Sequence, residues 1–170
     1  MNIVLQKADI NDFGITTEIF NKAIQFMNET GIDQWDEKYP SEELLRCDIE
    51  REQMFIGLLN NFVVSAVTLN EEQEFEYTEV AWKYNHGKIC VVHRLCVNPG
   101  EQGKGIGKKT MSLIEDVASS LQYNYIRLDA FSKNPAALSI YNSLGYQYAG
   151  HVIFRKGKFY CFEKALSHVK

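Results

Sequence analysis

The segment Val97–Lys109, with the sequence VNPGEQGKGIGKK, decides the fold of this chain. An apolar run, Ile89–Val97, leads into it, and a helical pattern, Ile106–Leu121, follows it. Four glycines within eight residues, at positions 100, 103, 105 and 107, let the backbone turn tightly and approach a ligand without an intervening Cβ. The first N–H groups of a helix have no partner within the helix, and the helix dipole favours negative charge there. The junction therefore predicts an anion site, best suited to phosphate, with an ordinary glycine-rich turn as the alternative.

Two common phosphate-binding loops do not fit these glycines. A Walker A loop ends in Gly-Lys-Ser/Thr, whereas Gly107 is followed by two lysines. A Rossmann fingerprint reads G-x-G-x-x-G near the first strand of its unit, whereas Gly103, Gly105 and Gly107 alternate in mid-chain. The stretch instead resembles the Q/R-x-x-G-x-G/A signature of the GNAT superfamily of acyl-CoA N-acyltransferases, with Gln102, Gly105 and Gly107 at its three fixed positions. The resemblance implies that the backbone amides of this loop hold the pyrophosphate of coenzyme A.

A second motif of the same family follows downstream. Asn134, Ala137 and Tyr141 match the pattern N-x-x-A-x-x-x-Y, and the family's frequent L-G-Y/F stands at residues 144–146. A spacing of seven places Asn134 and Tyr141 on the same side of one helix. Taken singly, Asn134 is an ordinary helix cap and Tyr141 a core aromatic residue. By resemblance, Tyr141 donates a proton or hydrogen bond to the departing thiolate and Asn134 bonds the pantetheine arm.

Length and composition indicate a single domain, residues 1–170, that is large enough to bury a full core. The chain has 45% hydrophobic and 24% charged residues, as soluble globular proteins do. Its net charge of −4 argues against general nucleic-acid binding, and no run of 18 apolar residues predicts a membrane span. The first residues lack the basic start and long apolar stretch of a signal peptide, so we expect a cytoplasmic protein.

The cysteine and histidine positions predict neither a disulfide framework nor a metal site. The four cysteines form no C-x-x-C pair, and the four histidines show no metal-ligand spacing. Cys90 and Cys96 lie in an apolar run, where a thiol acts as a small core residue.

The hydrophobic patterns predict strand, two helices, three strands, helix, strand, helix and two strands. The Asn60-Asn61 pair predicts a hairpin turn, Ser41 caps the second helix, and Gly145 ends the last. Antiparallel hairpins combined with a strand–helix–strand crossover indicate an α/β (α+β) domain. With the resemblance, they predict a GNAT-like fold with a mixed, mostly antiparallel central sheet flanked by helices. The expected strands are Ile3–Gln6, Met54–Leu59, Phe62–Leu69, Ile89–Val97, Tyr125–Phe131, Tyr148–Phe154 and Phe159–Lys164. The expected helices are one capped by Asn11 or Asp12 that runs to about Asn28, a short one that follows Ser41, Ile106–Leu121, and one that begins at Pro135 and stops before Gly145.

Two acidic segments carry aromatic residues, and both have two interpretations. Ile32–Pro40 holds Trp35 and Tyr39 among three carboxylates, and the excursion Asn70–Lys88, with a short strand or turn near Glu76–Trp82, holds five glutamates. Aromatic rings beside carboxylates can receive a cationic amine. They can equally anchor a loop to the core, or belong to a solvated charged loop. The residues expected to face the acceptor are Trp35, Tyr39, Glu79 and Asp129.

Acyl transfer from a thioester to an amine makes chemical demands that this chain can meet. A free alkylamine has a pKa of about 10, so a base, or a water chain to one, must take its proton. His93 is the first candidate, because alternation along its strand places it on the face of Leu95 and Val97 and because imidazole accepts protons near neutral pH. Asp129 and Glu79 are the other candidates. A covalent route through Cys96 has no visible activating partner.

Together these features predict an N-acetyltransferase that transfers an acetyl group from acetyl-CoA to a primary amine by direct attack in a ternary complex. The alternatives are a non-catalytic acyl-CoA-binding or sensor domain and an enzyme that acetylates protein N-termini or lysines. The acceptor, a small molecule or a peptide, is not fixed by the sequence, and neither is the choice between monomer and homodimer. Tyr141 and His93 are the predicted catalytic residues. The predicted cofactor-binding residues are Leu95, Cys96, Val97, Gln102, Gly103, Lys104, Gly105, Ile106, Gly107, Lys108, Asn134 and Tyr141.

Overall fold

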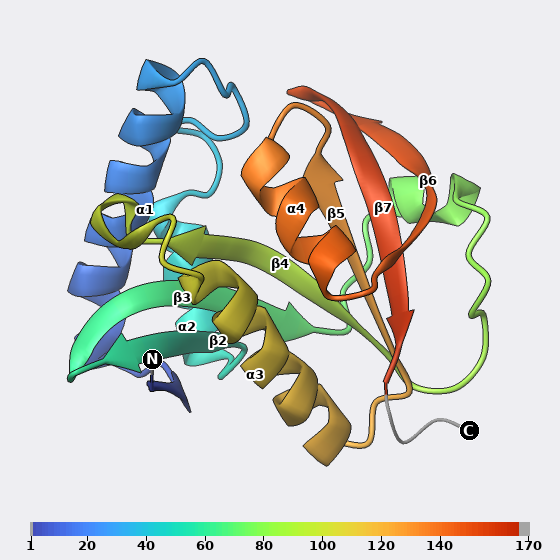
Figure 1. Cartoon of the computed structure of the whole chain (residues 1–170), viewed down its shortest axis with the longest axis horizontal. Coiled ribbons are helices and arrows are strands. Elements are labelled where there is room, and N and C mark those ends of the chain that lie inside the picture. Colours follow the sequence, from blue (N-terminus) through green and yellow to red (C-terminus); the bar gives the residue numbers. More distant parts are fainter. Residues whose placement is uncertain (1, 167–170) are drawn as a thin grey trace. The chain divides into compact units, whose positions relative to one another are not determined.

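The computed structural model describes residues 2–166 and confirms the predicted order of strands and helices (Figure 1). The strands are β1 Ile3–Lys7, β2 Met54–Leu59, β3 Phe62–Asn70, β4 Ile89–Val97, β5 Tyr125–Phe131, β6 Gln147–Phe154 and β7 Gly157–Ala165. The α-helices are α1 Phe13–Glu29, α2 Glu42–Glu50, α3 Ile106–Ser120 and α4 Pro135–Ser143. Short 3-10 helices are η1 Ile10–Asp12, η2 Phe75–Glu79 and η3 Pro99–Glu101.

The strands of the described chain form one seven-stranded sheet in the order β1-β2-β3-β4-β5-β7-β6. Strands β4 and β5 are parallel, as the crossover through α3 requires, and their register pairs Ile89, Cys90 and Val91 with residues 125–127. The pairs β1–β2, β2–β3, β5–β7 and β6–β7 are antiparallel. The prediction of a mixed, mostly antiparallel sheet flanked by helices is therefore confirmed.

The chain divides into two compact units, and each is described by itself. One unit comprises the residues up to Leu69 together with Arg94–Met111. The other comprises Asn70–His93 together with the described residues from Ser112 onward.

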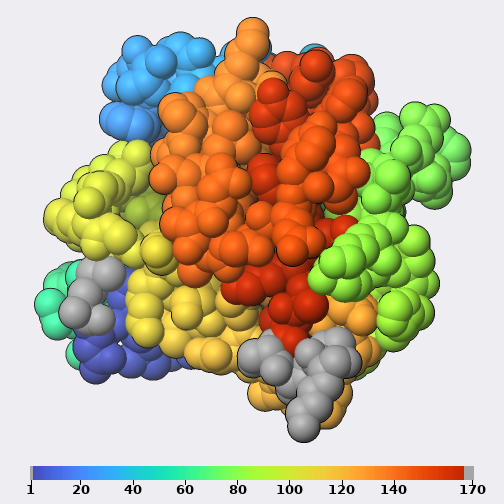
Figure 2. Space-filling view, turned by 45° about the vertical axis from the view of Figure 1, so that its right-hand side comes forward, coloured from blue at the N-terminus to red at the C-terminus, as the bar shows by residue number. Residues whose placement is uncertain are grey.

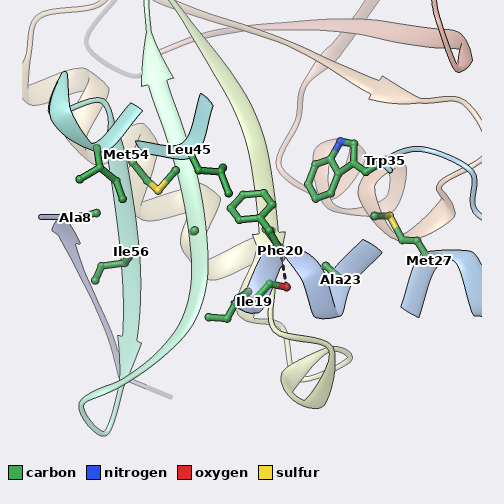
Figure 3. Packing of buried hydrophobic residues seen from close by; sticks show 12 residues of the cluster. Ala8, Ile19, Phe20, Ala23, Met27, Trp35, Leu45, Met54 and Ile56 are labelled. Atoms are coloured by element: carbon green, nitrogen blue, oxygen red, sulfur yellow. Dashed lines mark hydrogen bonds between the residues drawn. The ribbon is translucent and has the colours of Figure 1, made fainter. Parts of the chain in front are cut away.

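The first unit has a core between α1, α2 and the sheet (Figure 3). Helix α1 turns one face inward because its apolar residues recur every three or four positions. Trp35 joins this core at 6% exposure, and its ring centroid lies 5.4 Å from that of Phe20. The buried residues of α1 are Thr16, Ile19, Phe20, Ala23 and Met27.

The beginning of α3 is fixed to β3 within the same unit. The hydroxyls of Ser65 and Thr110 are hydrogen-bonded at 2.8 Å, and both residues are fully buried. Any side chain at Gly57 would collide with Ser65, so the sequence keeps a glycine where β2 and β3 bring these groups together. This buried contact fixes the N-terminal part of α3 against β3.

Local signals in the sequence set the turns and most helix ends. Asn60 and Asn61 have φ angles of 51° and 66°, as a two-residue hairpin requires. Ser41 accepts a hydrogen bond from the amide of Leu44 at 3.2 Å, and so caps α2 as predicted. At α1 the side-chain cap belongs instead to Asp9, which forms a capping box around η1, whereas Asp12 makes no side-chain cap to α1.

The second unit contains β5, β6 and β7, and α4 contacts β5 (Figure 1). The excursion after β3 forms a 3-10 helix, Phe75–Glu79, and not a short strand. Figure 2 shows this segment, in green, at the surface beside the orange and red strands β6 and β7.

Buried polar contacts hold the excursion on the sheet. The Arg127 guanidinium donates to the carbonyl of Tyr84 at 2.6 Å and stacks over the ring of Trp82, 4.3 Å from its centroid. Glu163 accepts from the backbone amides of Lys83 and Tyr84 at 2.8 and 3.2 Å. The segment is thus anchored to the sheet, although Glu71, Glu72, Glu74 and Glu79 are exposed.

Candidate active site

The glycine-rich loop after β4 is a series of fixed turns. The Asn98 amide donates to Val64 O at 2.9 Å, and the Asn98 side chain accepts from the Gly100 amide at 3.3 Å. After η3, Gly103 and Gly105 have φ angles of 77° and 78°, in the left-handed region that glycine occupies at least cost. A Cβ built on either residue meets no protein atom within 4 Å, so the backbone conformation, and not crowding, requires glycine here.

Helix α3 begins directly after Gly105. Its first α-helical bond runs from the Lys109 amide to Gly105 O at 3.0 Å, which leaves the amides of residues 106–108 without acceptors inside the helix. Lys104 pairs with Glu101 at 2.9 Å, while Lys108 and Lys109 are exposed. A helix N-terminus, a left-handed glycine and nearby lysines suit a phosphate ester chemically.

The end of β4 supplies backbone groups, but it does not supply a reactive thiol. Cys96 is 2% exposed, and its Sγ faces Ile19 O at 3.9 Å. Burial raises the pKa of the Cys96 thiol, so the nucleophilic thiolate is scarce at neutral pH. Leu95 and Val97 are half-buried and flank this residue along the strand. The covalent route is therefore disfavoured here by the structure as well as by the sequence.

Arg94 interrupts the regular geometry of β4. Its φ is 52°, a left-handed conformation that is uncommon for a residue with a side chain. Regular alternation does not hold through such a residue, because it reorients the groups on either side of it. The strand is therefore not regular between His93 and Leu95, and the placement of His93 on the face of Leu95 and Val97 stays a prediction.

In the second unit, Tyr141 lies deep in an aromatic cluster. It is 5% exposed, and its ring lies 5.7 Å from Tyr146 and 6.0 Å from Phe162 between centroids. Burial raises the pKa of Tyr141, and the negative charge of Asp129 raises it further. The phenol is therefore protonated at neutral pH, as a proton donor must be. Asn134 caps the helix that carries it, since its side-chain oxygen accepts from the Ala137 amide at 3.2 Å.

Asp129 forms a short hydrogen bond with a residue that the sequence analysis did not single out. The hydroxyl of Tyr77, in η2, donates to Asp129 Oδ2 at 2.6 Å. Burial, followed by the Asp129 charge, raises the pKa of Tyr77, so this phenol also keeps its proton. The pair orients the carboxylate on β5 within the same unit as Tyr141.

The hydrogen bonds of His93 fix its tautomer. Its Nε2 lies 2.9 Å from Asn70 Oδ1 and 3.1 Å from Glu72 O. Asn70 Oδ1 also accepts from the Glu72 amide at 2.9 Å, which identifies it as the oxygen. Because both neighbours are acceptors, Nε2 carries a hydrogen, and in the neutral ring the lone pair is on Nδ1.

The residues expected to face the acceptor differ in exposure. Trp35 belongs to the core, which favours the anchoring interpretation, whereas Tyr39 is 38% exposed. Asp36 accepts from the backbone amides of Lys38 and Tyr39 and so supports its own turn. Glu79 is exposed at the end of η2.

Comparison with known proteins supplies the family. The family model described as "Acetyltransferase (GNAT) family" matches residues 20–146. The chain belongs to the GNAT acetyltransferase family. GNAT enzymes are acyl-CoA-dependent N-acyltransferases, so this chain is an acetyltransferase of that kind. No curated protein sequence matches it.

Solved structures share this GNAT fold at low sequence identity. A GNAT family acetyltransferase from Streptococcus agalactiae is 21% identical, with a TM-score of 0.85 over 96% of this chain and 95% of that one. The acetyltransferase yncA from Salmonella typhimurium, solved with its cofactor acetyl-CoA, is 19% identical, with a TM-score of 0.72 over 98% and 95%. The paia N-acetyltransferase from Thermoplasma acidophilum, in complex with coenzyme A, is 18% identical, with a TM-score of 0.72 over 97% and 99%.

Two features are absent from residues 2–166 of this GNAT chain. No group of three or more histidine, cysteine, aspartate or glutamate residues there is arranged to hold a metal ion. No helix in the same range has the length and apolar character of a membrane span.

The GNAT motifs fall in different units, and each unit groups part of the predicted site. The first contains the loop, residues 95–97, Trp35 and Tyr39; the second contains His93, Asn134, Tyr141, Glu79 and Asp129. Sequence reasoning missed Tyr77 and the side-chain role of Arg94. Two signals were available in the sequence: a tyrosine in an acidic loop and an arginine inside an apolar strand. Each indicates a hydrogen-bonded partner, because a buried polar group needs one.

Proposed function

We propose that this GNAT acetyltransferase transfers the acetyl group of acetyl-CoA directly to a primary amine in a ternary complex, as a single domain. The observation that carries the proposal is the fixed loop of left-handed glycines that opens α3. The amides of residues 103–108 would hold the pyrophosphate, with Gln102, Lys104 and Lys108 around it. The amides of Leu95, Cys96 and Val97 would bind the thioester carbonyl, where charge develops in the transition state.

The second unit would supply the proton chemistry of the proposed reaction. Tyr141, held as a phenol, would donate to the sulfur of the departing coenzyme A thiolate. His93 Nδ1, directly or through water, would take the proton of the attacking amine. The bond from amine nitrogen to carbonyl carbon forms as the carbon–sulfur bond breaks. Asn134 would bond the pantetheine arm, and Asp129 and Glu79 would face the amine.

Membership of the family favours an enzyme over the non-catalytic acyl-CoA sensor. The buried phenol of Tyr141 favours it too, because a sensor needs no proton donor. Acetylation of protein N-termini or lysines stays a second acceptor class, since the same chemistry serves a peptide amine. A cytoplasmic location, the absence of a metal requirement and the choice between monomer and homodimer stay predictions from the sequence.

Thiol release from acetyl-CoA across a panel of amines tests the proposal. We expect release that depends on the amine, with diamines and other cationic primary amines most active and amides inactive. Mass spectrometry should find one acetylated amine for each thiol released. Acetyl-CoA binding with no amine-dependent release across small amines and peptides would favour the sensor interpretation.

We also predict that carboxylates of the Ile32–Pro40 loop attract the cationic amine. Replacing Asp33 by Asn and Glu37 by Gln should lower kcat/KM for the best amine about threefold at low ionic strength and flatten its salt dependence. Asp36 is kept because it supports its own turn. Initial rates across ionic strength would measure this effect.

The control for this prediction removes the same charge from α1. Glu18→Gln with Glu29→Gln eliminates two exposed carboxylates outside the loop. Its salt curve should follow the parent curve. If both double variants behave alike, the loop carboxylates are ordinary surface charges.

A further inference from the structure

Arg94 is the centre of a buried polar network within the first unit. Its side chain is 8% exposed, and the Asp48 side chain that faces it is 4% exposed. Arg94 Nε donates to Asp48 Oδ2 and Nη2 donates to Oδ1, each at 2.9 Å, which is a bidentate pair. The Thr68 hydroxyl donates to Asp48 Oδ2, also at 2.9 Å.

The remaining guanidinium nitrogen reaches the acceptor-side loop. Arg94 Nη1 donates to the hydroxyl of Tyr39 at 3.1 Å. One side chain therefore joins Asp48 on α2 and Tyr39 in the Ile32–Pro40 loop, from a position on β4. The Asp48 contact is the stronger of the two, because both of its partners are charged. The Tyr39 contact is the more exposed one.

The backbone of Arg94 links this network to the chemistry. Its left-handed φ of 52° stands immediately before Leu95, the first of the three residues whose amides we assign to the thioester carbonyl. A conformation that is costly for arginine persists only where its surroundings determine it. The bidentate contact with Asp48 is one such restraint within the first unit, since a planar guanidinium held at two nitrogens cannot turn without losing both bonds.

We propose that Arg94 is a positioning residue that couples the acceptor-side loop to the strand segment that binds the thioester. The inference rests on the proposed function. The Asp48 contact holds the backbone turn that directs the amides of residues 95–97. The Tyr39 contact fixes the position of the Tyr39 ring relative to those amides. One side chain, Arg94, thereby aligns the amine with the thioester.

Kinetics of two substitutions and their combination test the coupling. Tyr39→Phe removes only the hydroxyl and should lower kcat/KM for the amine about fivefold, with KM for acetyl-CoA unchanged. Arg94→Lys keeps the charge but loses the bidentate geometry, and should lower kcat about 30-fold. The kcat/KM for the amine in the double variant should be no lower than in Arg94→Lys, because both substitutions break the same connection. Additive losses would overturn the proposal.

Thr68→Val is the matched control, since it weakens the support of Asp48 without touching the link to Tyr39. Its melting temperature should fall, while kcat/KM stays within about twofold of the parent. A loss of activity in Thr68→Val as large as that in Tyr39→Phe would reduce Arg94 to a stabilising residue.

Hydrogen exchange separates failure of this inference from failure of the proposed function, because it needs no turnover. Tyr39→Phe should speed amide exchange in residues 32–39, and Arg94→Lys should speed it both there and in residues 95–98. Unchanged exchange of residues 32–39 in Tyr39→Phe would contradict the coupling, even if the parent acetylated no amine.

Discussion

Gly105→Asp should abolish coenzyme A binding while leaving the protein folded. Coenzyme A affinity measured by calorimetry should fall at least about 100-fold, which is about 2.7 kcal/mol. The aspartate places a carboxylate at the start of α3, where the pyrophosphate is proposed to sit, and two anions cannot share the same few amides. The free energy of unfolding should fall by only about 1 kcal/mol. The new side chain meets open space, so the loss comes chiefly from the left-handed φ at this position.

Gly31→Asp is the matched control for this experiment. Gly31 has a φ of 77°, almost the value at Gly105, and a Cβ there also meets no protein atom within 4 Å. The substitution therefore adds the same charge and the same backbone strain outside the glycine-rich loop. Coenzyme A affinity in Gly31→Asp should stay within about twofold of the parent, and its melting temperature should fall as in Gly105→Asp. Equal affinity of the two variants would remove the loop from the cofactor site.

Tyr141→Phe should lower turnover about 100-fold with little change in coenzyme A affinity. The substitution removes a hydroxyl whose proton is proposed to go to the departing thiolate, and it keeps the ring that packs between Tyr146 and Phe162. Because burial and Asp129 hold the pKa of Tyr141 above its ordinary value, the parent phenol stays protonated across the neutral range. Steady-state rates and calorimetry on the same preparations would separate the two effects.

Tyr146→Phe provides the comparison, since it removes a second buried hydroxyl from the same aromatic cluster. Its kcat should stay within about threefold of the parent, because Tyr146 has no proposed part in the chemistry. A Tyr141→Phe enzyme with parental kcat, or equal losses in both variants, would make Tyr141 a packing residue.

The elements with strong local signals were predictable from the sequence. Strands β2, β4 and β5 have the predicted ends, because each is an apolar, β-rich run bounded by polar or turn-forming residues. Ser41 and Asn134 cap the beginnings of their helices as predicted, and Gly145 follows the end of α4. Capping of this kind depends on residues only a few positions apart. The glycine-rich loop was predictable for the same reason.

Features that depend on distant partners were not predictable. Arg94 and Asp48 are 46 positions apart, and nothing local indicates that a buried arginine would adopt a left-handed φ. Tyr77 and Asp129 are separated by 52 positions, and their pairing follows from a 3-10 helix packed on the sheet. The regular alternation assumed for His93 does not extend through Arg94, because the φ of Arg94 is left-handed.

Direct transfer of the acetyl group from bound acetyl-CoA to an amine is the central claim, and a single-turnover experiment tests it most directly. Enzyme in excess over labelled acetyl-CoA would be mixed with the best amine of the panel, quenched at intervals, and analysed by mass spectrometry of both protein and amine. The account predicts that the label appears in the amine as it leaves acetyl-CoA, with no acetylated protein at any time. Label that passes through the protein, or that stays on coenzyme A in the presence of every amine, would contradict it.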